Sequence, residues 1–279
     1  FPFYAGTPVL LAGWQWLVVL ASLALAFWLL TTALIPPGHG IGMLLRPLLF
    51  CSVPLLALAW VAGPAWSALF RRVHSRDVLL MVAIAVLNLM LTLLVGLLFA
   101  NAMHASANPL FGSLSAADGS TRLITFAAMV PQLLGEELFT ILPFLACLWL
   151  LHTKLKTSRR TALLLAWLLS ALPFALIHLP TYQWNVLQCL LIICTARLVL
   201  SLAYIFSRNL WVCTGAHVLN DWALFGRDAV TGTRTHPTPS SHGPAYGVTL
   251  ASTLAPRSTR SGASNTGVYS KMAMMKRTQ

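Results

Sequence analysis

Two adjacent glutamates, Glu136 and Glu137, lie near the centre of a run that is otherwise almost wholly apolar and extends from Leu123 to Leu151. The chain has six acidic residues, so a third of them stand side by side inside this run. An ionised carboxylate at the centre of a bilayer costs at least ~2.5 kcal/mol even on lenient insertion scales. Such a pair is retained only where it faces a polar cavity or a partner, so it indicates a functional site.

Composition places the chain in a membrane. Of its 279 residues, 58% are hydrophobic and 9% are charged, and the mean hydropathy is +0.77. A soluble domain typically has ~25% charged residues. The net charge of +12 lies mostly in loops and in the C-terminal tail, where it orients the chain rather than binding nucleic acid. We expect an integral protein of the bacterial inner (plasma) membrane, with the lipid bilayer as a partner and no nucleic-acid partner.

Seven apolar runs reach, or nearly reach, the ~20 residues that a spanning helix needs. This pattern predicts an all-α, polytopic bundle of seven or eight transmembrane helices, the eighth being a half-span or an additional N-terminal helix. The runs are Val9–Ile35, Ile41–Ala62, Val78–Ala100, Leu123–Leu151, Ala162–Leu179, Trp184–Phe206 and Leu210–Phe225.

Lysines and arginines orient this bundle. The connections after the second, fourth and sixth runs are basic, whereas the alternate connections hold little charge, so the basic connections are predicted to be cytoplasmic, together with the N-terminus. Their residues are Arg71, Arg72, Arg76, Lys154, Lys156, Arg159, Arg160 and Arg208.

Three parts follow from the pattern of runs. Residues 1–121 are predicted to form N-terminal transmembrane helices, and residues 122–225 a helical core that contains the glutamate pair. Residues 226–279 are rich in Thr, Ser, Pro and Gly, and they predict a disordered, polar, basic tail.

The late runs contain four more ionisable groups: His178, Arg197, His217 and Asp221. His217 and Asp221 are four residues apart, so they share one helix face, and the carboxylate can fix the tautomer of the imidazole. Asn220 points about 100° away, which makes Asp221 the better partner for His217. Glu136 and Glu137 cannot face the same point, so one should face a reaction centre and the other should brace it.

Three short motifs in this order resemble those of the CPBP family, which contains CAAX proteases and bacteriocin-processing enzymes. The resemblance covers about 123–225, and its motifs are Glu136-Glu137, Phe174-x-x-x-His178 and His217-x-x-x-Asp221. In the family's first motif an arginine follows four residues after the second glutamate. That position is Ile141 in this chain, and Arg197 is the expected substitute, within salt-bridge reach of Glu137.

The resemblance implies an intramembrane endopeptidase that acts on a membrane-associated peptide or protein. It implies that Glu136 is a general base for water, that Asp221 orients His217, and that both histidines hold the water and the oxyanion or ligate a metal. Phe174 would pack against His178. Glu136, His178 and His217 match a catalytic zinc set in kind, and they equally match a metal-free site, so Zn²⁺ is a candidate cofactor rather than a required one.

Three alternatives stay open at this point. A non-catalytic bacteriocin self-immunity or scaffold protein of the same fold would account for the missing motif arginine. A proton-coupled transporter would also place Glu and His in a membrane, although no internal repeat is visible to support one. Finally, the glutamates could serve only as buried ion-pair partners of Arg197.

Overall fold

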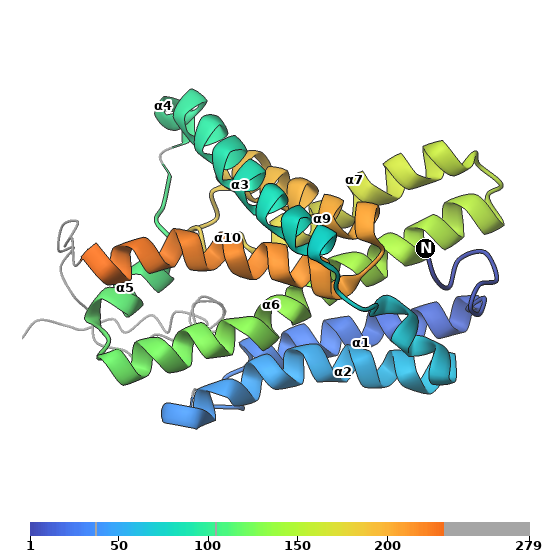
Figure 1. Ribbon diagram of the computed structural model, residues 1–279, viewed down its shortest axis with the longest axis horizontal. Coiled ribbons are helices and arrows are strands. Elements are labelled where there is room, and N and C mark those ends of the chain that lie inside the picture. Colours follow the sequence, from blue (N-terminus) through green and yellow to red (C-terminus); the bar gives the residue numbers. More distant parts are fainter. Residues whose placement is uncertain (37, 104, 232–279) are drawn as a thin grey trace, which may run out of the picture.

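The computed structural model describes residues 1–36, 38–103 and 105–231, and within these ranges every regular element is a helix (Figure 1). The short elements are the 3₁₀ segments η1 (Gly40–Leu44) and η2 (Gly63–Leu69) and the π-helical turns η3 (Trp149–Lys154) and η4 (Cys189–Ile193). The α-helices are α1 (Gly13–Thr31), α2 (Leu45–Ala62), α3 (Ser75–Leu98), α4 (Ala100–Met103), α5 (Pro109–Ala116), α6 (Gly119–Leu148), α7 (Arg159–Ile177), α8 (Val186–Gln188), α9 (Cys194–Ser207) and α10 (Leu210–Thr231).

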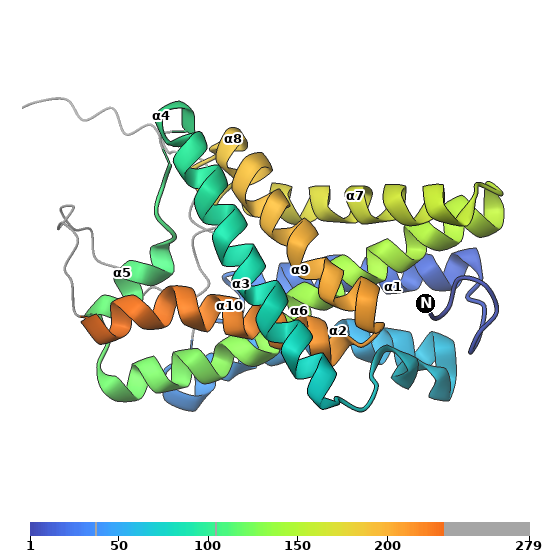
Figure 2. The same ribbon diagram turned by 45° about the horizontal axis from the view of Figure 1, so that its top comes forward.

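The chain is a polytopic helical membrane protein, as its composition predicts. Within the described residues, six segments are long and apolar enough to cross a bilayer: 13–31, 40–69, 75–98, 119–154, 159–177 and 186–207. The seventh predicted span is the helix α10, but it is not among these six. Its sequence carries His217, Asn220 and Asp221, which lower its hydropathy, and it packs along α3, α6 and α9 inside the bundle. Both ribbon views show α10 lying beside α6 (Figure 2).

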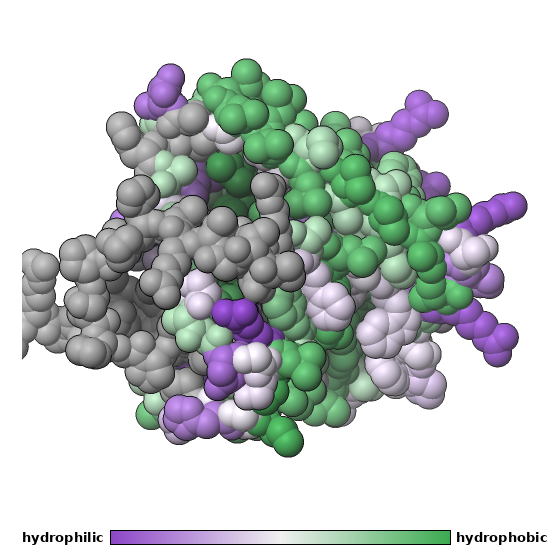
Figure 3. Space-filling model, turned by 60° about the vertical axis from the view of Figure 1, so that its left-hand side comes forward, coloured by the Kyte–Doolittle hydropathy of each residue, from purple (hydrophilic) through white to green (hydrophobic). Residues whose placement is uncertain are grey.

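The three basic connections lie at one end of the bundle, where the N-terminus also lies (Figure 1). The α6–α7 turn, the link from α2 to α3 and the α9–α10 turn all reach this end. Hydrophobic residues cover much of the side seen in Figure 3, and several hydrophilic side chains project from the end on the right (Figure 3). This common end agrees with the charge pattern, and its assignment to the cytoplasm stays a prediction.

Helix α6 is the centre of the structure. In the most apolar part of its span 67% of the residues are buried in the protein, compared with 17 to 39% for the other spans. One hydrophobic cluster joins it to α1, α2, α3, α7, α9 and α10, so the N-terminal helices share a core with the segment that carries the motifs. The glutamates on α6 therefore face protein rather than lipid.

Helix boundaries differ from the apolar runs in three places. Helix α7 ends at Ile177, so His178 is its C-cap residue rather than a member of a span. The predicted link after the third run contains the short helix α5, whose first turn is capped by the Asn108 side chain, which accepts from the backbone N–H of Leu110. Helix α10 continues to Thr231, so the tail does not begin at Gly226; residues 232–279 of the predicted tail lie outside the described residues.

Candidate intramembrane active site

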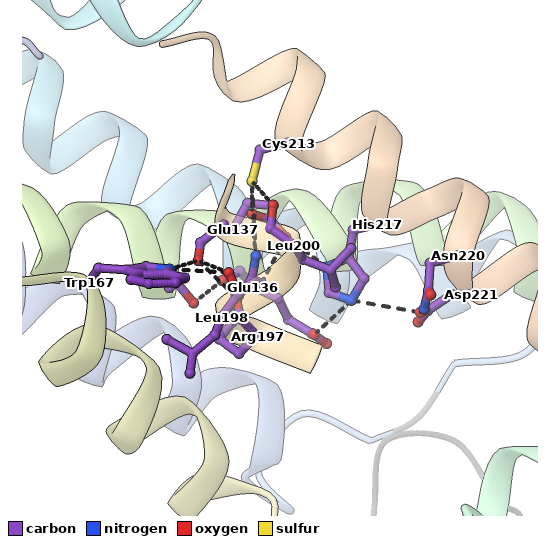
Figure 4. Close-up of polar contacts among 12 residues, drawn as sticks. Glu136, Glu137, Trp167, Arg197, Leu198, Leu200, Cys213, His217, Asn220 and Asp221 are labelled. Atoms are coloured by element: carbon purple, nitrogen blue, oxygen red, sulfur yellow. Dashed lines mark hydrogen bonds and ion pairs between the residues drawn. The ribbon is translucent and has the colours of Figure 1, made fainter. Parts of the chain in front are cut away.

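The carboxylate of Glu137 is the centre of a fully buried polar cluster (Figure 4). Both of its oxygens accept hydrogen bonds from the guanidinium of Arg197, each at 2.8 Å. The Nδ1 of His217 lies 2.7 Å from Oε1, and the thiol of Cys213 donates to Oε2. Paired in this bidentate way, the two charges compensate each other in a place where either alone would be very costly.

Arg197 reaches Glu137 from α9, which replaces the brace that an arginine at position 141 would supply from α6 itself. Ile141 is instead a buried core residue, with 1% of its surface exposed. The guanidinium carbon of Arg197 lies 5.0 Å from the centroid of the Phe174 ring, a cation–π contact that holds the arginine from a third helix, α7. The predicted ion pair is therefore present, and it ties α6 to α9.

Glu136 has a different environment from its neighbour. Its side chain keeps 16% of its surface accessible, and its Oε1 accepts a hydrogen bond of 3.5 Å from the amide of Gln132. Its other oxygen lies 3.9 Å from Nε2 of His217. Successive helical residues point about 100° apart, so Glu136 lines a cavity while Glu137 is buried between helices.

His217 connects the two glutamates. A carboxylate can only accept, so Nδ1–H donates to Glu137 and the second nitrogen, Nε2, is directed towards Glu136. Asp221 lies 3.7 Å from that same Nε2. Glu137, from another helix, bonds the nitrogen that fixes the tautomer, and Asp221 faces the other nitrogen, so the orienting role of Asp221 stays a prediction.

His178 is held at the end of α7. Its Nδ1–H donates to the backbone carbonyl of Phe174 at 2.7 Å, and the two rings are in contact at a tilt of 41°, with centroids 4.7 Å apart. This arrangement leaves Nε2 as the nitrogen available for chemistry. His178 lines the same cavity as Glu136, His217 and Asp221.

This cavity has a volume of about 470 Å³. It is lined by α6 as far as Glu136, α10 from His217 onward, the ends of α1 and α7, the first turns of α2, the second half of α3, α5 and the first half of α9. These segments all lie away from the basic connections, so the cavity occupies the opposite half of the bundle. Apolar side chains such as Phe27, Leu30 and Phe50 form part of its wall.

Residues 118–223 match the model of the family described as type II CAAX prenyl endopeptidase Rce1-like. This match supports the resemblance of the segment to the CAAX protease (CPBP) family. Neither the curated proteins nor the solved structures that were searched gave a match. The matched segment contains every residue of the three family motifs and also Arg197, whereas α1, α2 and α3 lie before it.

The zinc set implied by the family motifs fits only in kind. Among the residues that the structure describes, no three His, Cys, Asp or Glu side chains are grouped so that they could hold one metal ion. His178, whose Nδ1–H donates to its own helix backbone, keeps Nε2 free, and no such group of ligands forms around it within the described residues.

Two further residues of the cavity were missed by reasoning from the sequence. Asn88 on α3 is buried with 2% exposure and donates to Asn220, whose amide in turn donates to Asp221, each at 2.9 Å. Asn220 therefore supports Asp221 rather than pointing away from the site. An asparagine in the middle of the apolar α3 was the available signal.

Tyr182 is the second missed residue. It lies in the α7–α8 link, lines the cavity and receives a hydrogen bond from Asn108. Burial raises the pKa of Tyr182 to about 12, so its hydroxyl stays protonated at neutral pH and can donate a hydrogen bond. A tyrosine between two apolar runs carries no pattern that marks it in the sequence.

Proposed function

We propose that this protein is an intramembrane endopeptidase in which Glu136 is the general base for a water molecule. The observation that carries the proposal is that the two ring nitrogens of His217 face different glutamates. One ring nitrogen bonds the buried Glu137–Arg197 pair, and the other faces the accessible Glu136 across 3.9 Å at the cavity wall. A water molecule beside this gap can contact both the carboxylate and Nε2.

In the proposed reaction Glu136 takes a proton from this water, and the resulting hydroxide attacks the carbonyl carbon of the peptide bond. The oxyanion receives a hydrogen bond from the cavity wall, for which the Tyr182 hydroxyl is the candidate. The Nε2 of His178 carries no proton in this tautomer, so it can accept a hydrogen bond from the attacking water. The protonated Glu136 then returns its proton to the leaving amine as the C–N bond breaks. Glu137 and Arg197 stay charged throughout and keep the imidazole of His217 in one tautomer.

The arrangement around Arg197 bears on the alternative of a non-catalytic immunity or scaffold protein. That alternative drew its support from the missing motif arginine. Because Arg197 contacts Glu137 through both guanidinium ends, the support is removed. An endopeptidase of the bacterial inner membrane, acting on a membrane-associated peptide or protein, accounts for the retained groups together.

The test uses purified protein in lipid nanodiscs, a library of quenched apolar peptides, and water enriched in ¹⁸O. We expect cleavage with one ¹⁸O atom incorporated into the new carboxyl terminus of the product, as attack by water requires. A parallel reaction with a chelator decides whether Zn²⁺ takes part: loss of cleavage assigns a metal, and unchanged cleavage assigns the metal-free route. Absence of cleavage across the library, with folded protein, would contradict the proposed function.

A further inference from the structure

Arg46, near the start of α2, is a buried cation without a counter-charge. Only 7% of its surface is exposed. Its Nη2 donates to the backbone carbonyls of Thr32, at 2.8 Å, and Ile35. Within the described part of the chain, Nε and Nη1 have no hydrogen-bond partner, and no carboxylate forms an ion pair with this guanidinium.

A buried guanidinium in this state is unfavourable unless a bound group supplies a counter-charge and hydrogen-bond acceptors. An unpaired charge removed from water is costly, and unmet N–H donors add to that cost. The two carbonyls account for one nitrogen of Arg46. Thr32 is the C-cap residue of α1, whose carbonyl an arginine can satisfy, and Ile35 lies in the connection that follows. They leave Nε and Nη1 unexplained.

Arg46 lines the same cavity as Glu136 and His217. The position of Arg46 along the bundle, relative to Glu136 and His217, can be judged from Phe50. Phe50 lies one turn, or about 6 Å, further along α2 than Arg46. A Cβ added to Gly135 would overlap Cδ1 of Phe50, so this ring packs directly on the backbone beside Glu136. The cation is therefore about one helical turn from the level of the glutamate, towards the end of the bundle opposite the basic connections.

From this placement we infer that Arg46 forms an anion-binding subsite that accepts a carboxylate of the bound peptide. Guanidinium groups match carboxylates in charge and in geometry. The cavity around the cation has apolar walls, as a peptide with apolar side chains requires. The inference rests on the proposed function, since it assigns Arg46 to substrate selection by the same cavity; it lies outside the family-matched segment.

The experiment measures binding of three N-terminally labelled peptides of one apolar sequence. The first ends in a free carboxylate, the second in an amide, and the third in an amide preceded by aspartate. Binding is measured on the Glu136→Gln protein, in which a bound peptide stays intact, and on the wild type. We expect the free acid to bind about tenfold to hundredfold more tightly than the plain amide, as a charge-assisted hydrogen bond provides.

The aspartate peptide identifies the source of the carboxylate. Tight binding of this peptide assigns the subsite to any peptide carboxylate, and weak binding assigns it to the chain terminus. Arg46→Gln should remove the preference for the acid, while Arg46→Lys should keep part of it. Arg76→Gln removes an exposed cation at the opposite end and should keep all of it.

Equal binding of the acid and the amide by the wild type would overturn the inference, and this comparison needs no variant to fold. So would failure to bind either peptide. Stabilisation by phosphatidylglycerol over phosphatidylcholine that depends on Arg46, without discrimination between peptides, would assign the cation to a lipid phosphate instead. Carboxylate-selective binding without cleavage would support the subsite and contradict the proposed endopeptidase function. Cleavage without a preference for the carboxylate would support the endopeptidase function and contradict the subsite.

Discussion

Glu136 and Glu137 are neighbours in the chain and have opposite environments. Helical geometry alone predicts this, since adjacent residues cannot face the same point. Arg197 could also be predicted, because a buried carboxylate needs a buried cation and the late runs hold few. That Glu137 bonds Nδ1 of His217 could not be predicted, because spacing along one helix does not determine which group on another helix reaches this nitrogen.

At the residue scale, Arg197→Leu should strand Glu137 as an unpaired buried charge. The loss in the free energy of unfolding should be ~3–5 kcal/mol, seen as a lower midpoint of thermal unfolding in detergent. Replacing both members, with Arg197→Leu and Glu137→Leu together, should recover much of this loss. Arg76→Leu, at an exposed position, is the control and should change little. Equal effects of the two arginine changes would contradict a structural ion pair.

Tyr182 gives a prediction that depends on pH. Its pKa, raised to about 12 by burial, means that it should stay mostly un-ionised at about pH 11, where an exposed tyrosine is largely tyrosinate. Because the unfolded chain would lose this proton first, the free energy of unfolding should fall with rising pH above about 10.

The absorbance difference between the wild type and Tyr182→Phe, followed near 295 nm as the pH rises, isolates this one hydroxyl. A midpoint near 10 would show that Tyr182 is exposed to solvent. If the hydroxyl donates to the oxyanion, Tyr182→Phe should also lower kcat, by up to the ~10²–10³-fold found for such donors.

At the scale of elements, apolar runs predict the helices well and their ends poorly. Length and hydropathy determine that a segment is helical in lipid, whereas the ends depend on local caps such as Asn108 on α5. Helix α10 shows that hydropathy alone can also miss a helix of the bundle. Its polar residues reduce its hydropathy because it faces other helices and a cavity, so packing rather than composition explains its place.

The contact between α2 and α6 should tolerate no side chain at Gly135. A Cβ there would overlap the Phe50 ring, so Gly135→Ala should destabilise the protein by ~1–3 kcal/mol. Phe50→Leu in the same chain should recover part of this loss by making room. Gly112→Ala on α5 is the matched control, since a Cβ there meets nothing within 4 Å. Thermal unfolding of the wild type, the two alanine variants and the double variant measures the effect. Equal stability of Gly135→Ala and Gly112→Ala would contradict this packing.

At the scale of the whole molecule, the charge pattern and the cavity together predict the side of access. The basic connections are expected in the cytoplasm, and the cavity lies in the half of the bundle away from them. The site should therefore be reached from the opposite side of the membrane. The sequence predicts the orientation, but it could not predict the cavity's depth, which depends on how the helices around it pack.

Labelling of single cysteines in sealed vesicles tests this orientation. A membrane-impermeant thiol reagent added outside right-side-out vesicles should label Ser115→Cys on α5 and leave Lys156→Cys unlabelled, since both positions are exposed in the structure. Opening the vesicles should make both reactive. Labelling of Lys156→Cys alone from outside would reverse the orientation.

The most direct measurement of the central claim is the cleavage rate of Glu136→Gln, which keeps the shape of the side chain and its hydrogen bonds but removes the base. We predict a loss of at least ~100-fold in kcat, with an unchanged unfolding temperature. Asp118→Asn, which removes an exposed carboxylate that caps α6, should keep the wild-type rate. A Glu136→Gln protein that cleaves peptides as fast as the wild type would show that Glu136 is not the catalytic base.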